Sequence, residues 1–203
     1  MGQGKIHIYE GDGKGKTTAA VGLAVRFAGK GGRVYVTQFL KRDDSGELNG
    51  MEEVTGITVR RCSKVFGFTF QMSEEEKQAA ADYYTAHLHG ILVEIRKHCS
   101  DVLPLEGQDR NYHAKESRDQ EGKMQQPACM LVLDEVLDAY NQEMISRREL
   151  LDFLGAKPAG LEVVMTGRNP APELLALADY VTYMEARKHP YGQGLAARPG
   201  IEW

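Results

Sequence analysis

The sequence predicts an α/β fold, a mostly parallel β-sheet with helices on both faces. Short apolar segments alternate along the chain with segments of helical periodicity, which is the pattern of such folds. The segment 33–39, RVYVTQF, is β-branched and aromatic, with the nearly continuous apolar character of a parallel strand buried on both faces. The first apolar segment leads through a glycine-rich loop into a helix, which adds a third indication of the same fold class.

The length and composition indicate one domain, covering residues 1–203. Charged residues make up 27 % of the chain, hydrophobic residues 42 %, and the formal net charge is −4. No lysine–arginine block is present, which argues against a nucleic acid or an anionic membrane as partner. No apolar run approaches the ~18 residues that a membrane span needs. Cys62, Cys99 and Cys129 are far apart and odd in number, so they predict core residues in a reducing, cytoplasmic protein.

The individual elements follow from periodicity and from capping signals. Expected strands lie around Ile6 and Ile8 and at 33–39, 57–62, 129–136, 161–166 and 180–184. Expected helices start at Lys16, at a capping box of Ser73 and Glu76, at a second box of Ser146 and Glu149, and at Pro172. The segment 40–53 is polar and predicts a loop. Residues 104–127 are charged and without periodicity, so we expect a disordered surface insertion there.

The glycine-rich segment Lys5–Thr18, KIHIYEGDGKGKTT, predicts a phosphate-binding loop. Its glycines let a row of backbone N–H groups curl around an anion, and the following helix directs its positive end to the same place. Lys16 supplies a charge for the phosphates, and the Thr17 hydroxyl is placed to hold Mg²⁺. The usual pattern is G-x-x-x-x-G-K-[ST], and Glu10 stands where its first glycine is expected. A chance glycine-rich turn is the alternative, which the strand before and the helix after it disfavour.

Ligands of open parallel sheets bind at the carboxyl ends of the strands. That rule gathers five segments onto one edge: 11–18, 38–41, 68–70, 134–135 and 166–168. Asp134 follows a buried strand and predicts a second Mg²⁺ partner, with Glu135 acting beside it; the alternative is an ordinary acidic strand end. Arg168 predicts a phosphate clamp, or else a surface arginine. Lys41 carries a weaker signal of the same kind.

Other side chains at this edge admit two interpretations each. Gln38 belongs either to the site or to sheet packing. His189 is weak evidence of a site and has a structural alternative. Aromatic residues in a loop are more often packed in a core, but Phe68 and Phe70 would point the same way in an extended segment and could support a flat apolar ligand.

Taken together, the motifs resemble the P-loop ATP:corrinoid adenosyltransferases. The resemblance rests on GDGKGKTTAA (11–20), QFLK (38–41), SGE (45–47), GFTF (67–70), LDE (133–135), TGR (166–168), ADYVT (178–182), KHP (188–190) and GIE (200–202). These motifs follow the family's order over nearly the whole chain. The phosphate loop of that family also lacks the usual first glycine, so Glu10 fits the resemblance.

The resemblance implies a RecA-like P-loop fold and a homodimer. It implies transfer of the 5′-deoxyadenosyl group of ATP to the Co(I) of a corrinoid, cobalamin or cob(I)yrinic acid a,c-diamide, with release of triphosphate. A flavin-type reductase would supply the reduction of Co(II). The rival predictions are a P-loop kinase or ATPase, and a non-catalytic module that delivers corrinoid.

By motif matching, the resemblance also implies residue roles. Implied catalytic residues are Lys16, Phe68, Phe70, Glu135 and Arg168, with Phe68 and Phe70 displacing the lower ligand of cobalt. Implied binding residues are Gly11, Asp12, Gly13, Lys14, Gly15, Lys16, Thr17, Thr18, Gln38, Lys41, Arg168, Lys188 and His189. Thr17 and Asp134 would hold Mg²⁺. Family members commonly have tryptophan where Phe70 stands, so this chain keeps an apolar surface there but lacks the indole N–H.

Overall fold

The computed structural model describes residues 3–41, 44–64, 66–67, 69–100, 129–190, 194 and 196–201. The predicted insertion at 104–127 and the predicted site residue Phe68 lie outside these ranges. The side chain of Phe70 is not described either, although its backbone belongs to a short 3₁₀-helix, Thr69–Gln71. Within the described residues, no helix is long and apolar enough to cross a membrane.

The centre of the protein is a six-stranded sheet in the order β3-β2-β4-β5-β1-β6. The strands are β1 (Ile6–Glu10), β2 (Arg33–Gln38), β3 (Ile57–Val59), β4 (Cys129–Asp134), β5 (Leu161–Gly167) and β6 (Tyr180–Tyr183). Every strand pairing in the described part of the chain is parallel. The predicted fold class is therefore confirmed. A parallel arrangement also brings the carboxyl ends of β1, β2, β4 and β5 to one edge.

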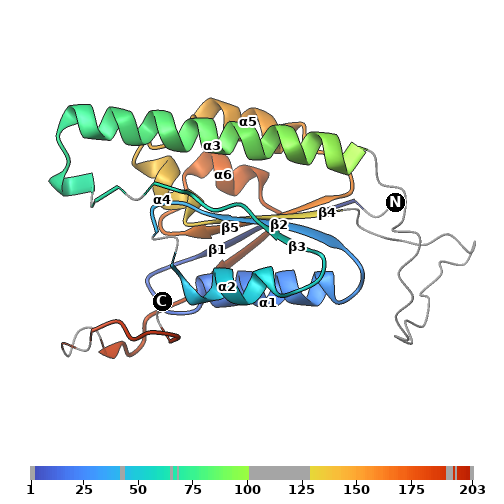
Figure 1. Cartoon of the computed structure of the whole chain (residues 1–203), viewed down its shortest axis with the longest axis horizontal. Coiled ribbons are helices and arrows are strands. Elements are labelled where there is room, and N and C mark those ends of the chain that lie inside the picture. The colour runs from blue at the N-terminus through green and yellow to red at the C-terminus, as the bar shows by residue number, and fades with distance from the viewer. Residues whose placement is uncertain are drawn as a thin grey trace, which may run out of the picture.

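Helices cover both faces of the sheet, as predicted (Figure 1). One face is covered by α1 (Lys16–Ala28) and α2 (Gly46–Glu52), and the other by α3 (Glu74–Ser100), α4 (Val136–Asn141), α5 (Arg147–Gly155) and α6 (Pro172–Leu177). Each face has its own buried apolar cluster, because successive strand residues point to opposite sides of the sheet. On β1, for example, Ile6 and Ile8 pack on the α3 side, whereas Tyr9 packs on the α1 side.

Two short helices differ from the sequence prediction. The segment 40–53, expected to be a loop, contains α2, because Leu48 and Met51 lie one helical turn apart and are both buried against the sheet. The strand expected at 129–136 ends at Asp134. Glu135 has a left-handed backbone with φ of 58°, which breaks the strand and places Val136 at the start of α4. The expected strand 57–62 is likewise shorter and ends at Val59.

The first predicted capping box is confirmed, and of the second only the serine half is present. Ser73 Oγ accepts a hydrogen bond from the Glu76 N–H at 3.2 Å, and the Glu76 carboxylate accepts one from the Ser73 N–H at 2.8 Å. Ser146 Oγ accepts from the Glu149 N–H at 3.2 Å, while the Glu149 carboxylate is paired with His89 instead. Both boxes satisfy backbone donors that a helix start leaves without partners. Pro172 is the first residue of α6, as its fixed φ favours.

Glu162 on β5 connects β5 to β1, the strand that carries the phosphate loop. Its carboxylate accepts hydrogen bonds from His7 Nε2 at 2.7 Å and from the Lys5 N–H at 2.8 Å. Burial alone would raise the pKa of Glu162, but these two hydrogen bonds outweigh it and the pKa is lowered. A lowered pKa means that the contribution of Glu162 to stability is complete above 4.5 and is lost as the pH falls through the lowered value.

Glu162→Gln is therefore expected to destabilise the protein at neutral pH by about 1.5–3 kcal/mol, the usual net value of a hydrogen bond to a charged group. For a chain of this size, at about 2–4 °C per kcal/mol, the melting temperature should fall by roughly 3–12 °C. Thermal unfolding at neutral pH and again well below pH 4.5 measures the effect, and the difference from wild type should disappear in acid. Glu53→Gln, at an exposed position, is the control and should leave the melting temperature unchanged at both pH values. A pH-independent difference would contradict this role of Glu162.

Candidate functional site

The surface is hollowed at the carboxyl edge of the sheet, next to the glycine-rich loop. The hollow has a volume of about 570 Å³. Its lining comprises Asp12, Gly13, Lys14, Gly15, Lys16, Thr17, Thr18, Val21, Lys41, Gly46, Glu47, Glu135, Arg168, His189, Gly200 and Ile201. The loop between β1 and α1 thus faces residues from the ends of β2, β4 and β5, which are far apart in the sequence. The convergence predicted for this edge is confirmed for these segments.

The glycines of the loop are required by backbone geometry and by a close neighbour. Gly11 and Gly15 have φ of 119° and 117°, in the left-handed region that other residues avoid. The chain just after β6 runs against the loop, and the Gly13 N–H donates to the Met184 carbonyl at 2.7 Å. A Cβ atom on Gly13 would lie 2.6 Å from that carbonyl oxygen. The loop conformation therefore depends on Gly13 having no side chain.

Gly13→Ala is expected to cost about 1–3 kcal/mol, as overpacking against fixed backbone does, and to weaken ATP binding by displacing the loop. The melting temperature and the dissociation constant of ATP measure the two effects. The control is Gly22→Ala, in the interior of α1, where nothing lies within 4 Å of the new Cβ. Alanine is the better helix former by about 1 kcal/mol, so Gly22→Ala should be neutral or stabilising. Equal effects at the two positions would show that the contact with Met184 is unimportant.

Lys16 is buried under the loop that it follows. It is 7 % exposed, and its Nζ donates to the carbonyls of Gly11 at 2.7 Å and Gly13 at 3.0 Å. Burial lowers the pKa of Lys16, and the nearby positive charge of Arg168 lowers it further. An ammonium group with two neutral partners and little solvent contact favours an anion in the hollow, because the anion would replace the missing hydration.

Asp134 lies beneath the hollow and collects hydrogen bonds from two strands, a helix and the loop that follows β2. It is 2 % exposed. Its carboxylate accepts from Thr17 Oγ1 at 2.9 Å, Thr166 Oγ1 at 2.6 Å, Gln38 Nε2 at 3.1 Å and Lys41 Nζ at 2.7 Å. Such a set of donors satisfies the oxygens of a buried carboxylate and fixes its orientation. The pairing of Thr17 with Asp134, predicted for metal binding, is present in the structure as a direct hydrogen bond.

Lys41 and Glu135 are the charged residues beside Asp134. Lys41 Nζ lies 3.6 Å from Glu135 Oε1. Burial would lower the pKa of Lys41, but the charges of Asp134 and Glu135 and the hydrogen bond to Asp134 raise it. Burial raises the pKa of Glu135 to about 7; the charge of Lys41 opposes this shift, while Asp134 and Asp138 reinforce it. The left-handed backbone of Glu135 is held by its N–H, which donates to Thr166 Oγ1 at 2.9 Å.

Arg168 reaches the hollow from a sharply turned backbone at the end of β5. Gly167 before it has φ of 145°, and a Cβ there would lie 2.5 Å from an Asp138 carboxylate oxygen. The Arg168 N–H donates to that carboxylate at 2.9 Å. The arginine is exposed and lines the hollow together with the residues of the loop. This position suits a guanidinium that binds phosphate oxygens.

The oxygen atoms around Asp134 are of the type that Mg²⁺ prefers. Mg²⁺ keeps several waters and binds through one or two carboxylates together with substrate phosphates, so Thr17 and Asp134 fit it without a dedicated cage. The described residues contain no group of three or more His, Cys, Asp or Glu that could hold a metal ion on its own. Gln38 Oε1, in the same network, is buried and has no hydrogen-bond partner among the described residues.

A comparison with protein-family models identifies the family to which this chain belongs. Residues 2–203 match the family model described as "ATP:corrinoid adenosyltransferase BtuR/CobO/CobP". The chain belongs to the ATP:corrinoid adenosyltransferase family. The family resemblance predicted from the sequence motifs is therefore confirmed over the whole chain.

Curated relatives agree with this assignment. Corrinoid adenosyltransferase CobA of Salmonella typhimurium and corrinoid adenosyltransferase of Escherichia coli are each 30 % identical over 202 residues, which cover 99 % of this chain and 86 % of the relative. Corrinoid adenosyltransferase of Sinorhizobium sp. is 29 % identical, over 99 % of this chain and 81 % of the relative. Among solved structures, EssC (ATPases 2 and 3) from Geobacillus thermodenitrificans gives a TM-score of 0.48 at 15 % identity, covering 98 % of this chain and 36 % of that one. The fold assignment rests on the sheet topology itself.

In this member of the family, most of the predicted site residues meet at one hollow. Those that line it are Asp12, Gly13, Lys14, Gly15, Lys16, Thr17, Thr18, Lys41, Glu135, Arg168 and His189. Asp134 and Gln38 lie buried beneath the hollow, and Gly11 contributes a carbonyl to Lys16. Lys188 does not line the hollow, although His189 beside it does. The predicted roles of Phe68 and Phe70 concern side chains outside the described part of the chain.

The structure adds site residues that the sequence reasoning did not select. Gly46 and Glu47 line the hollow from the start of α2, and Gly200 and Ile201 line it from the tail. Both pairs fall in motifs that carried the family resemblance, SGE and GIE, so a signal was present without an assigned role. Thr166 also gains a role in the structure, because its hydroxyl connects the Asp134 carboxylate with the Glu135 backbone N–H.

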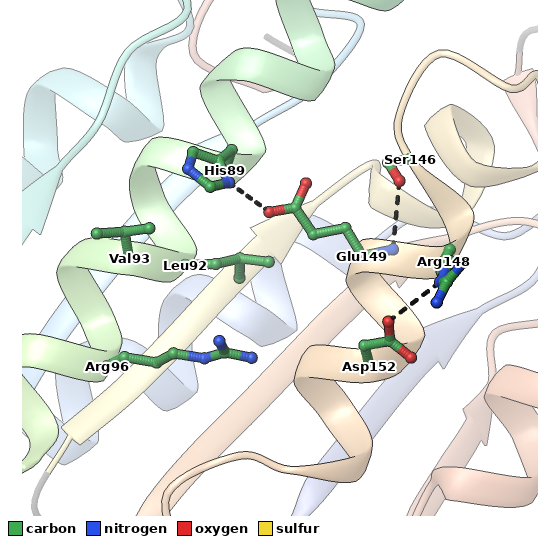
Figure 2. A pocket seen from close by; sticks show the side chains of 8 residues that line it. All are labelled: His89, Leu92, Val93, Arg96, Ser146, Arg148, Glu149 and Asp152. Carbon is green, nitrogen blue, oxygen red and sulfur yellow. Dashed lines mark hydrogen bonds and ion pairs between the residues drawn. The ribbon is translucent and has the colours of Figure 1, made fainter.

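A second hollow, of about 360 Å³, lies between α3 and α5 and shares no lining residue with the first. Figure 2 shows that two pairs of its charged side chains are directed at each other, His89 with Glu149 and Arg148 with Asp152. His89 Nδ1 contacts Glu149 at 2.6 Å, Arg148 lies 3.6 Å from Asp152, and the Arg96 guanidinium lies over the Phe153 ring. None of the predicted site residues lies here, so the chemistry is assigned to the hollow at the sheet edge.

Proposed function

We propose that this protein transfers the 5′-deoxyadenosyl group of ATP to the Co(I) centre of a corrinoid and releases triphosphate, in adenosylcobalamin synthesis or salvage. The observation that carries the proposal is the family match over residues 2–203 together with an assembled phosphate site around the buried Lys16. The curated relatives of Salmonella and Escherichia bear the name of this activity.

The reaction is a displacement at carbon. The electron pair of Co(I) forms a bond to the 5′-carbon of ATP, the bond from that carbon to the phosphate oxygen breaks, and triphosphate leaves with the electron pair. Cobalt becomes Co(III), and no proton has to be removed from the nucleophile. A protein general base is therefore unnecessary, and the main task of the residues is to hold and stabilise the leaving triphosphate.

The geometry suits that task. Residues 14–18, the ammonium of Lys16 and the side chain of Arg168 all line the hollow, whereas the Gly13 N–H is already paired with the Met184 carbonyl. Their charges are fixed before the reaction, so little reorganisation is needed as negative charge develops on the triphosphate. Thr17 and Asp134 would hold Mg²⁺, which supplies additional neutralisation of phosphate charge when bound. Glu135 lines the hollow and balances the positive charges of this group.

The corrinoid side of the reaction is proposed by motif matching. Phe68 and Phe70 would displace the lower ligand of cobalt and so ease the reduction of Co(II), with a flavin-type reductase as electron donor. We also propose a cytoplasmic homodimer. Phe68→Ala should then slow adenosylation that starts from Co(II), with reductant, by much more than adenosylation that starts from pre-reduced Co(I). Equal losses from the two starting states would indicate that Phe68 serves in ordinary packing.

The product formed from ATP distinguishes adenosyl transfer from the alternative functions. The protein is incubated with ATP, Mg²⁺ and chemically reduced cobalamin, and the products are separated by anion exchange. Adenosyl transfer gives triphosphate and adenosylcobalamin in equal amounts, whereas a kinase or ATPase gives ADP. A corrinoid-delivery module gives binding without turnover. Formation of ADP alone, or of no product, would overturn the proposal.

A further inference from the structure

The ammonium of Lys41 lies among the oxygen atoms that would receive a divalent cation. Lys41 Nζ donates to Asp134 Oδ2 at 2.7 Å and to Thr17 Oγ1 at 2.9 Å, and it lies 3.6 Å from Glu135 Oε1 and 4.0 Å from Glu47 Oε1. A magnesium ion binds oxygen at about 2.0–2.1 Å, closer than any of these contacts. The ammonium and the metal ion therefore compete for the same oxygens and repel each other.

The backbone holds Lys41 in this position. Phe39 is fully buried, and its N–H donates to the Asp134 carbonyl at 2.9 Å. Leu40 then adopts a left-handed conformation with φ of 56°, which is unfavourable for leucine and is maintained by the surrounding structure. The turn returns the Lys41 side chain to Asp134. The side chain is still 26 % exposed and lines the hollow, so its ammonium has a path from Asp134 toward a ligand there.

One atom of the same hydrogen-bond network, Gln38 Oε1, lacks a donor among the described residues. Gln38 Nε2 donates to Glu47 Oε1 at 2.7 Å and to Asp134 Oδ2 at 3.1 Å, and these two bonds fix the orientation of the amide. Its Oε1 is buried and has no donor in the described part of the chain. Lys41, a strong donor, is committed to Asp134 and Thr17. An ion that carries waters into this network would supply the missing donor, because metal-bound water donates readily.

We propose that Lys41 is a tethered substitute for the divalent cation: in the nucleotide-free protein its ammonium binds the Thr17 hydroxyl and the carboxylates of Asp134 and Glu135, and it moves from them to the triphosphate when Mg²⁺ enters with ATP. This inference rests on the proposed function, because Mg²⁺ and ATP are the ligands of that reaction. It gives Lys41 a role that precedes phosphate binding. It also couples the two ligands, since ATP offers the displaced ammonium a new partner.

A free metal ion should then bind weakly to the nucleotide-free protein, because it has to displace a charge that is already in place. Removing that charge should strengthen metal binding. The test is a titration of the full-length protein with Mn²⁺ in the absence of nucleotide, in which electron paramagnetic resonance measures free Mn²⁺. Lys41→Met keeps the length of the side chain and removes the charge, while Thr17, Thr166 and Gln38 still donate to Asp134.

Lys41→Met is expected to bind Mn²⁺ at least tenfold more tightly than wild type. Lys30→Met, at an exposed lysine beyond the end of α1, is the control and should bind as wild type does. The double variant Lys41→Met, Asp134→Asn should lose the gain, which locates the ion at Asp134. Binding by Lys41→Met that is equal to or weaker than that of wild type would overturn the inference. Tight binding that survives Asp134→Asn would overturn it as well.

Thermal unfolding provides a second measurement. Added Mn²⁺ should raise the melting temperature of Lys41→Met more than that of wild type; an equal rise would count against the inference. If Lys41→Met does not fold, Lys41→Gln is measured in the same way. Neither experiment contains ATP or corrinoid. A protein that forms no adenosylcobalamin but shows the predicted Mn²⁺ gain would refute the proposed function alone, and an active protein without the gain would refute the role of Lys41 alone.

Discussion

Lys16→Ala is expected to weaken ATP binding by at least about 100-fold and to abolish measurable adenosyl transfer. The Lys16 ammonium is buried beneath the phosphate loop, where its interaction with a triphosphate is poorly screened by water. Charge-assisted hydrogen bonds to such a group are worth about 1.5–3 kcal/mol each, so the loss of one or two accounts for this factor.

Isothermal titration with ATP and Mg²⁺ measures the binding, and the triphosphate assay measures turnover. Lys30→Ala is the matched control, because Lys30 is exposed and distant from the loop in sequence. The carbonyls of Gly11 and Gly13 lose their donor in Lys16→Ala, so the melting temperature of each variant must be compared as well. A folded Lys16→Ala protein that turns over ATP at the wild-type rate would refute the phosphate-loop assignment.

The sequence was sufficient for the elements whose signals are local. The strand, glycine-rich loop and helix from 6 to 28 were predicted because alternation, glycine positions and helical periodicity all agree there. The capping box of Ser73 and Glu76 and the capping serine of the second box were predicted for the same reason, whereas the pairing of Glu149 with His89 depends on a tertiary contact. The edge on which the site lies followed from the rule for parallel sheets, without knowledge of strand order.

The helix α2 was missed because its stability is not local. The segment GELNGME has two glycines and few apolar residues, so its intrinsic helix propensity is poor. Burial of Leu48 and Met51 against the sheet stabilises it, and that contact exists only in the folded protein. Glu47 at its start therefore could not be placed in the site in advance.

The detailed arrangement around Asp134 was also out of reach of sequence patterns. Asp134 and Thr17 were predicted to act together, but the inward position of Lys41 depends on the left-handed turn at Leu40. The hydrogen bond from Thr166 depends on the pairing of β4 with β5. A motif identifies which strand ends meet, whereas the partner of each oxygen atom is decided by side-chain packing at that edge.

Two substitutions of Asp134, to alanine and to asparagine, should separate its contribution to stability from its contribution to catalysis. Asp134→Ala removes an acceptor of Gln38 and the ion-pair partner of Lys41, and breaking an ion pair with a buried carboxylate costs at most about 3–5 kcal/mol. Asparagine at position 134 has nearly the same shape as the aspartate that it replaces. Its amide oxygen can accept from Gln38 and Lys41 while its amide nitrogen donates to the hydroxyls of Thr17 and Thr166, which act as donors or acceptors.

Asp134→Ala is therefore expected to lower the melting temperature by roughly 6–20 °C, at about 2–4 °C per kcal/mol, whereas Asp134→Asn should remain within a few degrees of wild type. Both variants should lose at least about 100-fold in adenosyl transfer, because neither supplies the charge that attracts the metal ion. Asp152→Ala, at a side chain that is 69 % exposed, is the control for both measurements. An active Asp134→Asn protein would remove Asp134 from the metal site and leave it the purely structural role of joining β2, β4 and β5 beneath the hollow.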